Sequence, residues 1–486
     1  MSAIIIGRKE EKKLLKKRLG SKEAEFIALY GRRRVGKTFL INHVLEDENA
    51  RSIEITGLKN GTLKKQLDIF IRAFEKAFKP EFPIATPKSW MNAFDMLTKA
   101  IGRLPKNKPF VIFLDELPWL ATPKSGLLEA LDHFWNTEWV NRAHIKLLVC
   151  GSAASWILEN IVNATGGLHN RLTASIRLRP FTIDEAAEFL AHRSLKINRA
   201  QVLDLYLVMG GIPFYLKAVE KGLSAAQNID QLCFTANGLL YEEFDRLYSS
   251  LFKNSEASIK IIRQIAKSPH GIDQATLEEE LAEASSGGTL TSRLGELEAA
   301  GFVISFVPYG HAKKGIYYRI IDEYTLFYLR WIEPVANRIK LASSQANFWQ
   351  SKCLTATWKS WVGNAFEAFC YKHIDLIAAA LKISTGFTVG TWRFIPKTKG
   401  QKGTQIDLLL DRDDGVITIF EIKYSQSPYR ITKQYATELG DKIDIFREQL
   451  GIKKEIHLAI ISSCGLVQNE YVEQLVTNEL TLEDIM

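Results

Sequence analysis

The sequence predicts a chain of several domains, the first of which is an α/β fold built on a parallel sheet. Over residues 1–195, short apolar runs alternate with amphipathic helical stretches, the pattern of a parallel sheet with crossover helices. A glycine-rich octapeptide at 31–38 directly follows the first of these runs, at 26–30. A length of 486 residues and a hydrophobic content of 46% allow two to four domains, each with its own core.

The rest of the chain divides by the kinds of element that it predicts. Residues 196–250 are helical, with a break at 210–213. Residues 255–322 predict three helices followed by two strands, which is the order of a winged helix-turn-helix. Residues 355–486 predict a helix, strands, a helix, a strand and a helix.

The octapeptide fits the pattern G-x-x-x-x-G-K-[ST] of the phosphate-binding loop. Gly31 and Gly36 let the backbone approach a phosphate chain, and the loop amides and the start of the next helix attract anions. Lys37 is expected to reach the β- and γ-phosphates, and Thr38 to offer its hydroxyl to Mg²⁺. The predicted nucleotide contacts are Gly31, Arg32, Arg33, Arg34, Val35, Gly36, Lys37, Thr38 and Phe39.

Two further apolar runs end in polar residues, at the sheet edge where ligands of open α/β folds bind. The run at 111–114 leads into Asp115, expected in the Mg²⁺ shell, and Glu116, expected to polarise the attacking water as general base. The run at 146–150 leads towards Ser152, which either contacts the γ-phosphate or the lytic water, or caps the next helix. Together with the loop, these residues predict hydrolysis of ATP.

Positive charge is concentrated at the amino terminus. The formal net charge is +8, and the first 40 residues hold twelve Lys or Arg against four Asp or Glu. Since the phosphate loop and the lysine-rich run at 12–18 account for this excess, bulk charge is weak evidence for nucleic-acid binding. Arg171 is a candidate arginine finger, acting in cis or on a neighbouring copy, with a surface salt bridge as the alternative.

The chain resembles the archaeal and bacterial ATPases of the STAND-like branch of the AAA+ superfamily, over nearly its whole length. The stretches that carry the resemblance are 6–11, 30–38, 114–120, 150–153, 166–171, 179–185, 210–213 and 318–322. The resemblance adds Gly7 and Arg8 near the adenine, and it implies ATP hydrolysis as a conformational switch, with a homo-oligomer as an option. The expected domains are a P-loop ATPase at 1–195, a helical lid at 196–250, a winged helix at 251–335 and a restriction-endonuclease-like domain with a preceding helical linker at 336–486.

The carboxyl-terminal segment holds a second group of charged residues. Asp407 lies on one apolar strand, while Glu421 and Lys423 are two residues apart on the next and so share a face. A hairpin between the strands brings the carboxylates together as ligands for Mg²⁺ or Mn²⁺, with Lys423 beside attacking water or phosphate. This pattern resembles the PD-(D/E)xK nuclease fold, although Gln405-Ile406 precedes Asp407 where that fold has proline. In that fold the first helix often supplies a further acid, here Glu367.

Three alternatives stay open for the second half of the chain. The Glu421–Lys423 pair is either a nuclease site, active or formerly active, or a structural ion pair. The basic loop at 393–402 either grips a phosphate backbone or is a solvated hairpin loop. The winged helix either contacts DNA, through 289–293 and Lys313-Lys314, or packs on the ATPase. Three helical residues that could face the acids are Lys433, Gln434 and Tyr435.

The sequence therefore predicts a cytoplasmic ATP-hydrolysing switch that controls a metal-dependent DNA nuclease domain. The alternative is an ATP-gated DNA-binding or scaffold protein with a decayed nuclease domain. Five scattered cysteines without a C-x-x-C pair fit a reducing compartment and no zinc site. We expect no signal peptide and no membrane span, because no apolar run approaches the ~20 residues that a bilayer requires. A kinase using the same loop would lack an identifiable acceptor site.

Overall fold

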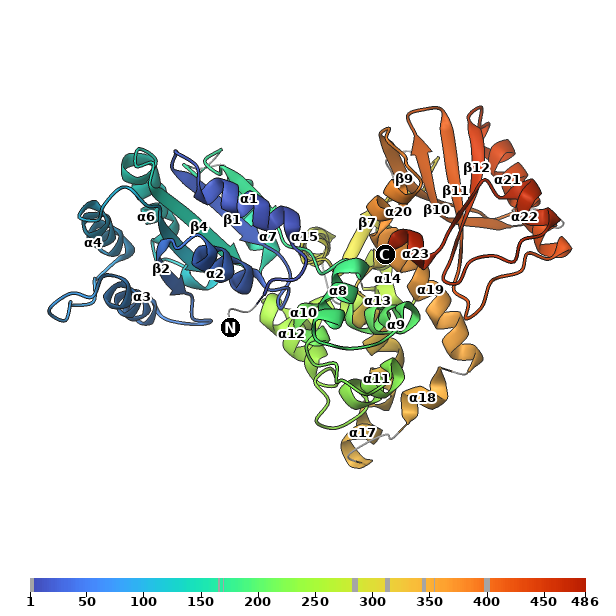
Figure 1. Ribbon diagram of the computed structural model, residues 1–486, viewed down its shortest axis with the longest axis horizontal. Helices are drawn as coiled ribbons and strands as arrows, with labels where there is room; N and C mark the ends of the chain where they lie inside the picture. Colours follow the sequence, from blue (N-terminus) through green and yellow to red (C-terminus); the bar gives the residue numbers. More distant parts are fainter. Residues whose placement is uncertain are drawn as a thin grey trace. The chain divides into compact units, whose positions relative to one another are not determined.

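The computed structural model describes residues 4–164, 167–168, 170–281, 287–310, 315–342, 347–353, 355–396 and 403–486. The chain forms two compact units, Met1–Pro180 and Phe181–Met486, which Figure 1 colours from blue to green and from green to red. Helix α8 (Ile183–His192) packs against α9 (Arg199–Met209) and so lies in the second unit. The first unit therefore ends at Pro180, short of the boundary at 195 that the sequence predicts.

The first unit is built on a parallel five-stranded sheet in the order β2-β3-β4-β1-β5. Its strands are β1 (Glu25–Tyr30), β2 (Arg51–Thr56), β3 (Phe110–Asp115), β4 (Ile145–Gly151) and β5 (Ala174–Arg177). The three central strands β1, β3 and β4 are buried along their whole length, as strands with both faces covered must be. The strands predicted at 26–30, 111–114 and 146–150 are confirmed as the centre of this sheet.

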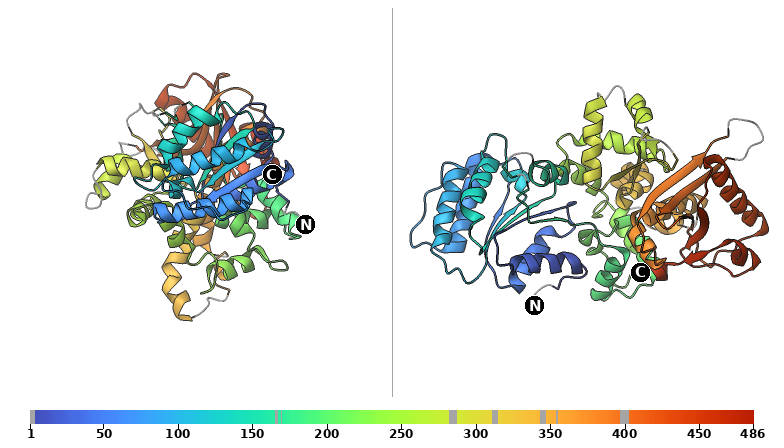
Figure 2. Two further views of the ribbon diagram at one scale, coloured as in Figure 1. Left: turned by 90° about the vertical axis from the view of Figure 1, so that its left-hand side faces the viewer. Right: turned by 90° about the horizontal axis from the view of Figure 1, so that it is seen from above.

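Helices connect these strands and flank the sheet (Figure 2). They are α1 (Lys9–Leu19), α2 (Lys37–Asp47), α3 (Leu63–Phe78), α4 (Trp90–Gly102), α5 (Leu117–Leu120), α6 (Leu127–Phe134), η1 (Trp135–Trp139), α7 (Ala154–Ile157) and η2 (Leu158–Val162). The starts of α3 and α4 follow local chemistry, because the side chains of Thr62 and Ser89 each accept a hydrogen bond from a backbone N–H of the first turn.

The second unit begins with short helices. After α8 and α9 come α10 (Pro213–Leu216), α11 (Ala225–Cys233) and α12 (Glu243–Leu251). Gly210 ends α9 with φ 66°, a conformation that glycine adopts without the strain of a side chain. A Cβ on Gly211 would lie 2.3 Å from the carbonyl oxygen of Phe181. The predicted break at 210–213 is confirmed. Glycine suits Gly210 because of its positive φ, and it suits Gly211 because another backbone segment comes close.

A small module of helices and strands follows, and we call residues 255–320 the α13–β8 module. Its elements are α13 (Ser255–Ala266), β6 (Ile272–Asp273), α14 (Gln274–Glu280), α15 (Gly287–Ala299), β7 (Val303–Phe306) and β8 (Tyr317–Ile320). The strands form an antiparallel sheet in the order β6-β8-β7. The three helices and two strands predicted for 255–322 are present in that order, with β6 as an addition, while Lys313 and Lys314 lie outside the described residues.

An aromatic helical segment links this module to the last part of the chain. It comprises α16 (Glu323–Phe327), η3 (Tyr328–Ile332), η4 (Glu333–Val335), α17 (Ala336–Ala342) and α18 (Phe348–Lys352). Trp331 and Trp349 meet edge to face, with ring centroids 5.3 Å apart. Across the described residues, every helix is too short or too polar to cross a bilayer.

The last part of the chain is a mixed five-stranded sheet with helices around it. Its elements are α19 (Ala356–Lys372), α20 (Ile374–Ala380), β9 (Phe387–Phe394), β10 (Thr404–Arg412), β11 (Val416–Lys423), α21 (Lys433–Leu450), β12 (Glu455–Ser462), α22 (Glu470–Leu475), β13 (Asn478–Leu480) and α23 (Leu482–Ile485). The order is β13-β12-β11-β10-β9, in which β9, β10 and β11 run antiparallel and β11, β12 and β13 run parallel. The predicted hairpin that places Asp407 and Glu421 on neighbouring strands is confirmed.

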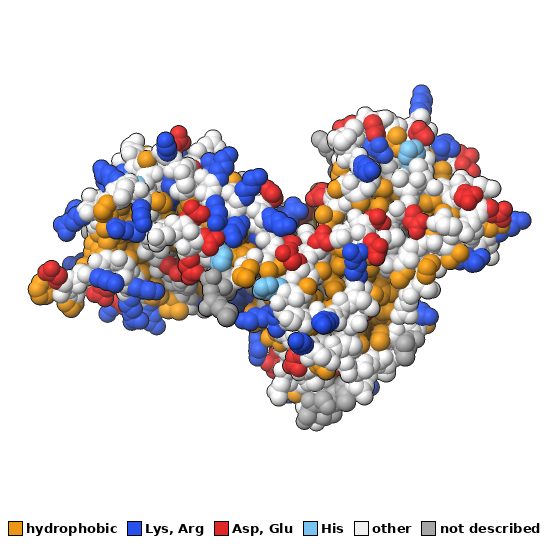
Figure 3. All heavy atoms as spheres, viewed as in Figure 1, with side chains coloured by type: hydrophobic (Ala, Val, Ile, Leu, Met, Phe, Trp, Pro, Cys, Tyr) orange, Lys and Arg blue, Asp and Glu red, His pale blue; other side chains and the backbone are white. Residues whose placement is uncertain are grey.

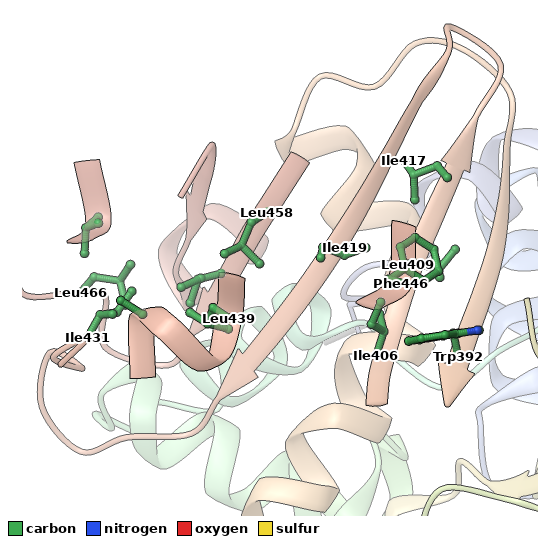
Figure 4. Packing of buried hydrophobic residues seen from close by; sticks show 13 residues of the cluster. Trp392, Ile406, Leu409, Ile417, Ile419, Ile431, Leu439, Phe446, Leu458 and Leu466 are labelled. Carbon is green, nitrogen blue, oxygen red and sulfur yellow. The ribbon is translucent and has the colours of Figure 1, made fainter. Parts of the chain in front are cut away.

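Helix α21 covers one face of this sheet, as the apolar side chains in Figure 4 show. Leu439 and Phe446 of the helix are 1% and 0% exposed, and they belong to the same cluster as Trp392 and Ile406 of the strands. The ring centroids of Phe446 and Trp392 are 5.0 Å apart. This contact fixes the helix on the sheet, and it therefore also fixes the helix residues that face Glu421.

We expect Phe446→Ala to lower the free energy of unfolding of the carboxyl-terminal sheet by about 3–5 kcal/mol, because it leaves a cavity in a closed core. Urea titration followed by tryptophan fluorescence measures the change. The control is Phe82→Ala, which removes the same atoms from a side chain that is 78% exposed. Equal effects of the two substitutions would contradict the packing described for α21.

Candidate functional site

The predicted phosphate loop lies between β1 and α2, at the carboxyl edge of the first sheet. A Cβ on Gly31, whose φ is 151°, would lie 2.2 Å from the carbonyl oxygen of Leu178, so only glycine fits there. Gly36 precedes α2 with φ 93°. The loop thus turns sharply against the segment that follows β5, and its amides precede the positive end of a helix.

Lys37 bends back over the loop. Its ammonium group donates to the carbonyl oxygens of Gly31 and Arg32, at 2.9 and 3.0 Å, and the side chain is buried. Two carbonyl partners hold the charge at the loop, where it is available to phosphate oxygens.

Thr38 and Asp115 meet although 77 residues separate them. The Thr38 hydroxyl donates to Asp115 Oδ2 at 3.0 Å, and the Glu116 amide donates to Asp115 Oδ1 at 3.0 Å. Asp115 is buried. A hydroxyl and a carboxylate at one point are hard oxygen ligands, so the residues present fit Mg²⁺.

Glu116 is held by Ser152. The amide and the hydroxyl of Ser152 both donate to Glu116 Oε2, at 3.1 and 2.9 Å. Glu116 itself has φ 48°, a left-handed conformation that costs energy in a residue with a side chain. Ser152 does not cap the next helix, which was one of its two expected roles. The residue before α7 is Ala153, and no side chain caps that helix.

Arg8, which the resemblance places near the adenine, contacts the loop from the amino terminus. Its Nη2 donates to the carbonyl oxygen of Val35 at 3.3 Å, and the side chain is buried. Gly7 and Arg8 both have positive φ. Arg8 therefore holds the loop in shape, while Phe39 is 49% exposed on the first turn of α2.

Arg171 lies at the other edge of the sheet. It is exposed and precedes β5, and the amide of Thr173 donates to the carbonyl oxygen of Phe26 at the start of β1. The phosphate loop follows the opposite end of β1, about five residues or 17 Å further on. The structure thus does not bring Arg171 to the phosphate loop of its own chain. Residues 166 and 169, in the predicted arginine region, lie outside the described residues.

A second cluster of charged residues lies in the carboxyl-terminal sheet, around Glu421 of β11. Lys423 Nζ lies 2.8 Å from Glu421 Oε1, and Lys442 Nζ lies 2.6 Å from Oε2. The Tyr435 hydroxyl also donates to Oε1. Burial alone would raise the pKa of Glu421, but the two lysines outweigh it and lower that pKa to about 2. Both carboxylate oxygens are engaged.

Glu367 of α19 and Asp407 of β10 form the other half of this cluster, together with Arg319 of β8. Arg319 is 5% exposed, and its guanidinium carbon lies 4.9 Å from the centre of the Tyr371 ring. Burial, and then the charge of Asp407, raise the pKa of Glu367 to about 8 against the opposing effect of Arg319. Glu421 raises this pKa further and Lys423 lowers it.

His270, which sequence reasoning missed, reaches the same cluster from the α13–β8 module. Its Nδ1 lies 3.5 Å from Asp407 Oδ1 and accepts a hydrogen bond from the Gln405 amide at 2.8 Å. The ligand atoms of His270, Glu367 and Asp407 all lie within 4.8 Å of one another. His270 stands in the turn between α13 and β6, and 135 residues separate it from Gln405. No spacing in the sequence links them.

The α13–β8 module packs directly on the carboxyl-terminal sheet. The Tyr309 amide donates to the carbonyl oxygen of Thr391 on β9 at 2.7 Å, and its hydroxyl donates to Asp411 at 2.9 Å. A cavity of about 220 Å³ remains between the two parts. Its lining includes His270, Phe306, Tyr317, Arg319, Trp392 and Asp407. Over the second unit, the face in Figure 3 shows basic and acidic side chains interspersed, without a uniform basic surface.

Residues 6–219 match the family model described as an ATPase domain predominantly from Archaea. The chain carries an ATPase domain of this archaeal type. The match covers the phosphate loop, Asp115, Glu116 and Ser152, so these residues lie within a domain whose nucleotide is ATP.

The chain is similar to two proteins of Methanocaldococcus jannaschii and to two solved structures. An uncharacterised protein of Methanocaldococcus jannaschii is 25% identical over 444 residues, which is 90% of this chain and 92% of that protein. An uncharacterised ATP-binding protein of the same organism is 42% identical over 52 residues, or 11% of this chain and 88% of that one. The Walker-type ATPase paby2304 of Pyrococcus abyssi has a TM-score of 0.48 at 18% identity, covering 67% of this chain and 96% of that one. The ORC2 protein of Aeropyrum pernix has a TM-score of 0.42 at 14% identity, covering 72% and 95%.

We expect the stability of the protein to depend on pH through Glu367. The raised pKa means that the folded chain keeps a proton that the unfolded chain releases, so the free energy of unfolding falls as pH rises from about 4.5 to about 8. Glu367→Gln removes this part of the decline. The free energy of unfolding of the variant, relative to that of the wild type, should therefore rise between pH 5 and pH 8 by at least the ~1.4 kcal/mol that one pKa unit represents.

Urea unfolding in the presence of a chelator measures this difference at each pH. The control is Glu473→Gln, which changes an exposed carboxyl on α22 of the same domain. A constant difference between Glu367→Gln and the wild type across this range would contradict the burial of a protonated Glu367.

Proposed function

We propose that this chain is a switch in which ATP binding and hydrolysis control a metal-dependent DNA nuclease activity of residues 336–486. The observation that carries the proposal is that Glu367 of α19 lies close to Asp407, Glu421 and Lys423 of the carboxyl-terminal sheet, in a chain that has an ATPase domain. The elements of this domain also follow the order helix, strands, helix, strand and helix that the sequence predicts for 355–486.

In the ATPase domain, each residue of the site has a role in hydrolysis. Lys37 binds the β- and γ-phosphates, and Thr38 and Asp115 hold the Mg²⁺ that accompanies ATP and neutralises charge on the phosphates. Glu116 orients the attacking water and accepts its proton, while Ser152 fixes the direction of the carboxylate. Arg171, exposed at the opposite edge, acts in the proposal on the nucleotide of a neighbouring copy.

In the nuclease-like domain, the acids divide into two groups. Glu367 and Asp407 are the carboxylates with oxygens left for Mg²⁺ or Mn²⁺, which would activate water and stabilise charge on the phosphate. Glu421 holds Lys423 in place through their ion pair, and Lys423 steadies a phosphate oxygen. DNA is the proposed substrate.

The same contacts favour a second candidate function. Both oxygens of Glu421 are engaged by Lys423, Lys442 and Tyr435, an arrangement that also suits a purely structural ion cluster. In that case the carboxyl-terminal domain binds DNA or a partner without cutting it, under the control of ATP.

We expect Lys37→Ala to reduce ATP turnover by at least about 100-fold, because it removes the cation that binds the phosphates. Glu116→Gln should keep ATP affinity and lose turnover, which separates binding from hydrolysis. Phosphate release and the affinity for a fluorescent ATP analogue are measured on the full chain. Lys99→Ala, an exposed lysine of α4, is the control. Unchanged turnover in Lys37→Ala would refute the assignment of the site.

We expect the wild-type chain to cleave plasmid or linear DNA in Mn²⁺, at a rate that changes when ATP is present. Lys423→Ala should reduce cleavage by at least about 100-fold, the cost of losing a group that stabilises transition-state charge. Lys453→Ala is the control, because this exposed lysine lies in the turn between α21 and β12. ATP-dependent DNA binding without any cleavage by the wild type would instead establish the second candidate.

A further inference from the structure

The Glu367–Asp407 pair has a nitrogen ligand beside it that comes from a different module. One ligand atom each of His270, Glu367 and Asp407 lies within 4.8 Å of the other two. Metal–ligand bonds of about 2.0–2.2 Å hold the ligands of one ion no more than about 4.4 Å apart, so the three atoms must draw slightly closer to share an ion. Small movements of side chains are enough to complete the site, because His270 is half exposed on a turn.

The amide of Gln405 lies between two of these ligand atoms. Its Nε2 donates both to His270 Nδ1, at 2.8 Å, and to Asp407 Oδ1. The amide nitrogen of Gln405, whose hydrogens carry partial positive charge, thus lies between two acceptor atoms, His270 Nδ1 and Asp407 Oδ1. These two contacts also settle the orientation of the Gln405 amide, because its oxygen would repel the carboxylate.

Arg319 is a second and independent sign of a ligand. The side chain is 5% exposed, and its Nε has no hydrogen-bond partner among the described residues. The guanidinium lies against the cavity that His270 and Asp407 also line. A buried donor without an acceptor is costly, and an anionic oxygen held beside a cation in this cavity would satisfy it.

We propose that His270, Glu367 and Asp407 bind one divalent cation, and that the imidazole makes this site prefer Mn²⁺ to Mg²⁺. Imidazole suits transition metals, whereas Mg²⁺ binds oxygen ligands and seldom gives up water. Arg319 then lies beside the ion to receive an oxygen of a phosphodiester. This inference rests on the proposed function, since it concerns the same cluster, and it adds that the α13–β8 module supplies a ligand.

The proposal has a structural consequence for the module. The cation would join the turn before β6 to α19 and β10, in addition to the contacts of Tyr309 with Thr391 and Asp411. Metal binding and docking of the α13–β8 module are therefore linked, and each favours the other.

The test measures binding of Mn²⁺ alone to the full chain without nucleotide. Asp115→Asn serves as the background, so that the metal position of the ATPase domain does not contribute. Isothermal titration should show one Mn²⁺ per chain. His270→Ala and His270→Gln should weaken Mn²⁺ at least about tenfold, in the range that loss of a partner costs a metal site, and Mg²⁺ no more than about threefold. Glu367→Gln should abolish binding of both ions.

The electron spin echo of bound Mn²⁺ identifies the ligand directly. Nitrogen modulation should be present in the background chain, absent from His270→Ala, and unchanged in His457→Ala, whose histidine pairs with Glu455 elsewhere in the same domain. Thermal unfolding confirms that each variant is folded, and His270→Gln replaces His270→Ala if the latter is not.

The outcomes separate this inference from the proposed function. Binding of Mn²⁺ without nitrogen modulation would overturn the role of His270 and leave a nuclease with carboxylate ligands intact. Nitrogen modulation in a chain that cleaves no DNA would support the site and remove the nuclease. Absence of Mn²⁺ binding would overturn the site, and DNA cleavage that still occurs would then require other ligands.

Discussion

Both candidate sites depend on one constraint, which is that a charge on a buried strand persists only where a second group compensates for it. Asp115 ends a fully buried strand and receives bonds from Thr38 and from the amide of Glu116. Glu421 lies on a central strand of the other sheet between two lysines. In each case at least one partner that compensates for the acid is also a residue to which we assign a role.

The two sites meet this constraint in different ways. In the ATPase domain, neutral donors hold the carboxylates of Asp115 and Glu116, to which we assign Mg²⁺ and the attacking water. In the carboxyl-terminal domain, lysines neutralise Glu421 fully, whereas burial raises the pKa of Glu367 beside Asp407. Both oxygens of Glu421 are engaged by lysines, whereas a cation could displace the proton that Glu367 keeps beside Asp407, and that is why Glu367 and Asp407 are the ligands we propose.

Local patterns made part of this predictable. The phosphate loop is eight consecutive residues, and Glu421 and Lys423 share a face because they are two apart on a strand. Asp115 could be placed opposite Thr38 because the carboxyl ends of parallel strands meet at one edge. Each inference needed only the chain geometry of a single element, or the edge of a single sheet.

The remainder depends on packing between elements that are distant in sequence. Nothing near His270 or Lys442 in the sequence indicates that they approach Asp407 and Glu421. Packing between distant elements positions the turn and the helix that carry them, and contacts such as Phe446 on Trp392 position the helix. Ser152 shows the same limit at short range: its position after a strand was predictable, but its choice of Glu116 over the next helix was not. Arg171 could be recognised as a candidate arginine finger, but the sequence did not show that it lies at the sheet edge opposite the phosphate loop.

The backbone bond from Tyr309 to Thr391 has a further consequence. β9 is the last strand of its sheet, and an outermost strand with free amides and carbonyls can pair with strands of other molecules. Tyr309 covers part of that rim, and Gly390 permits the approach, since a Cβ there would lie 3.3 Å from Cβ of Tyr309. The α13–β8 module therefore covers part of an edge that could otherwise pair with another molecule, and undocking the module would expose that edge.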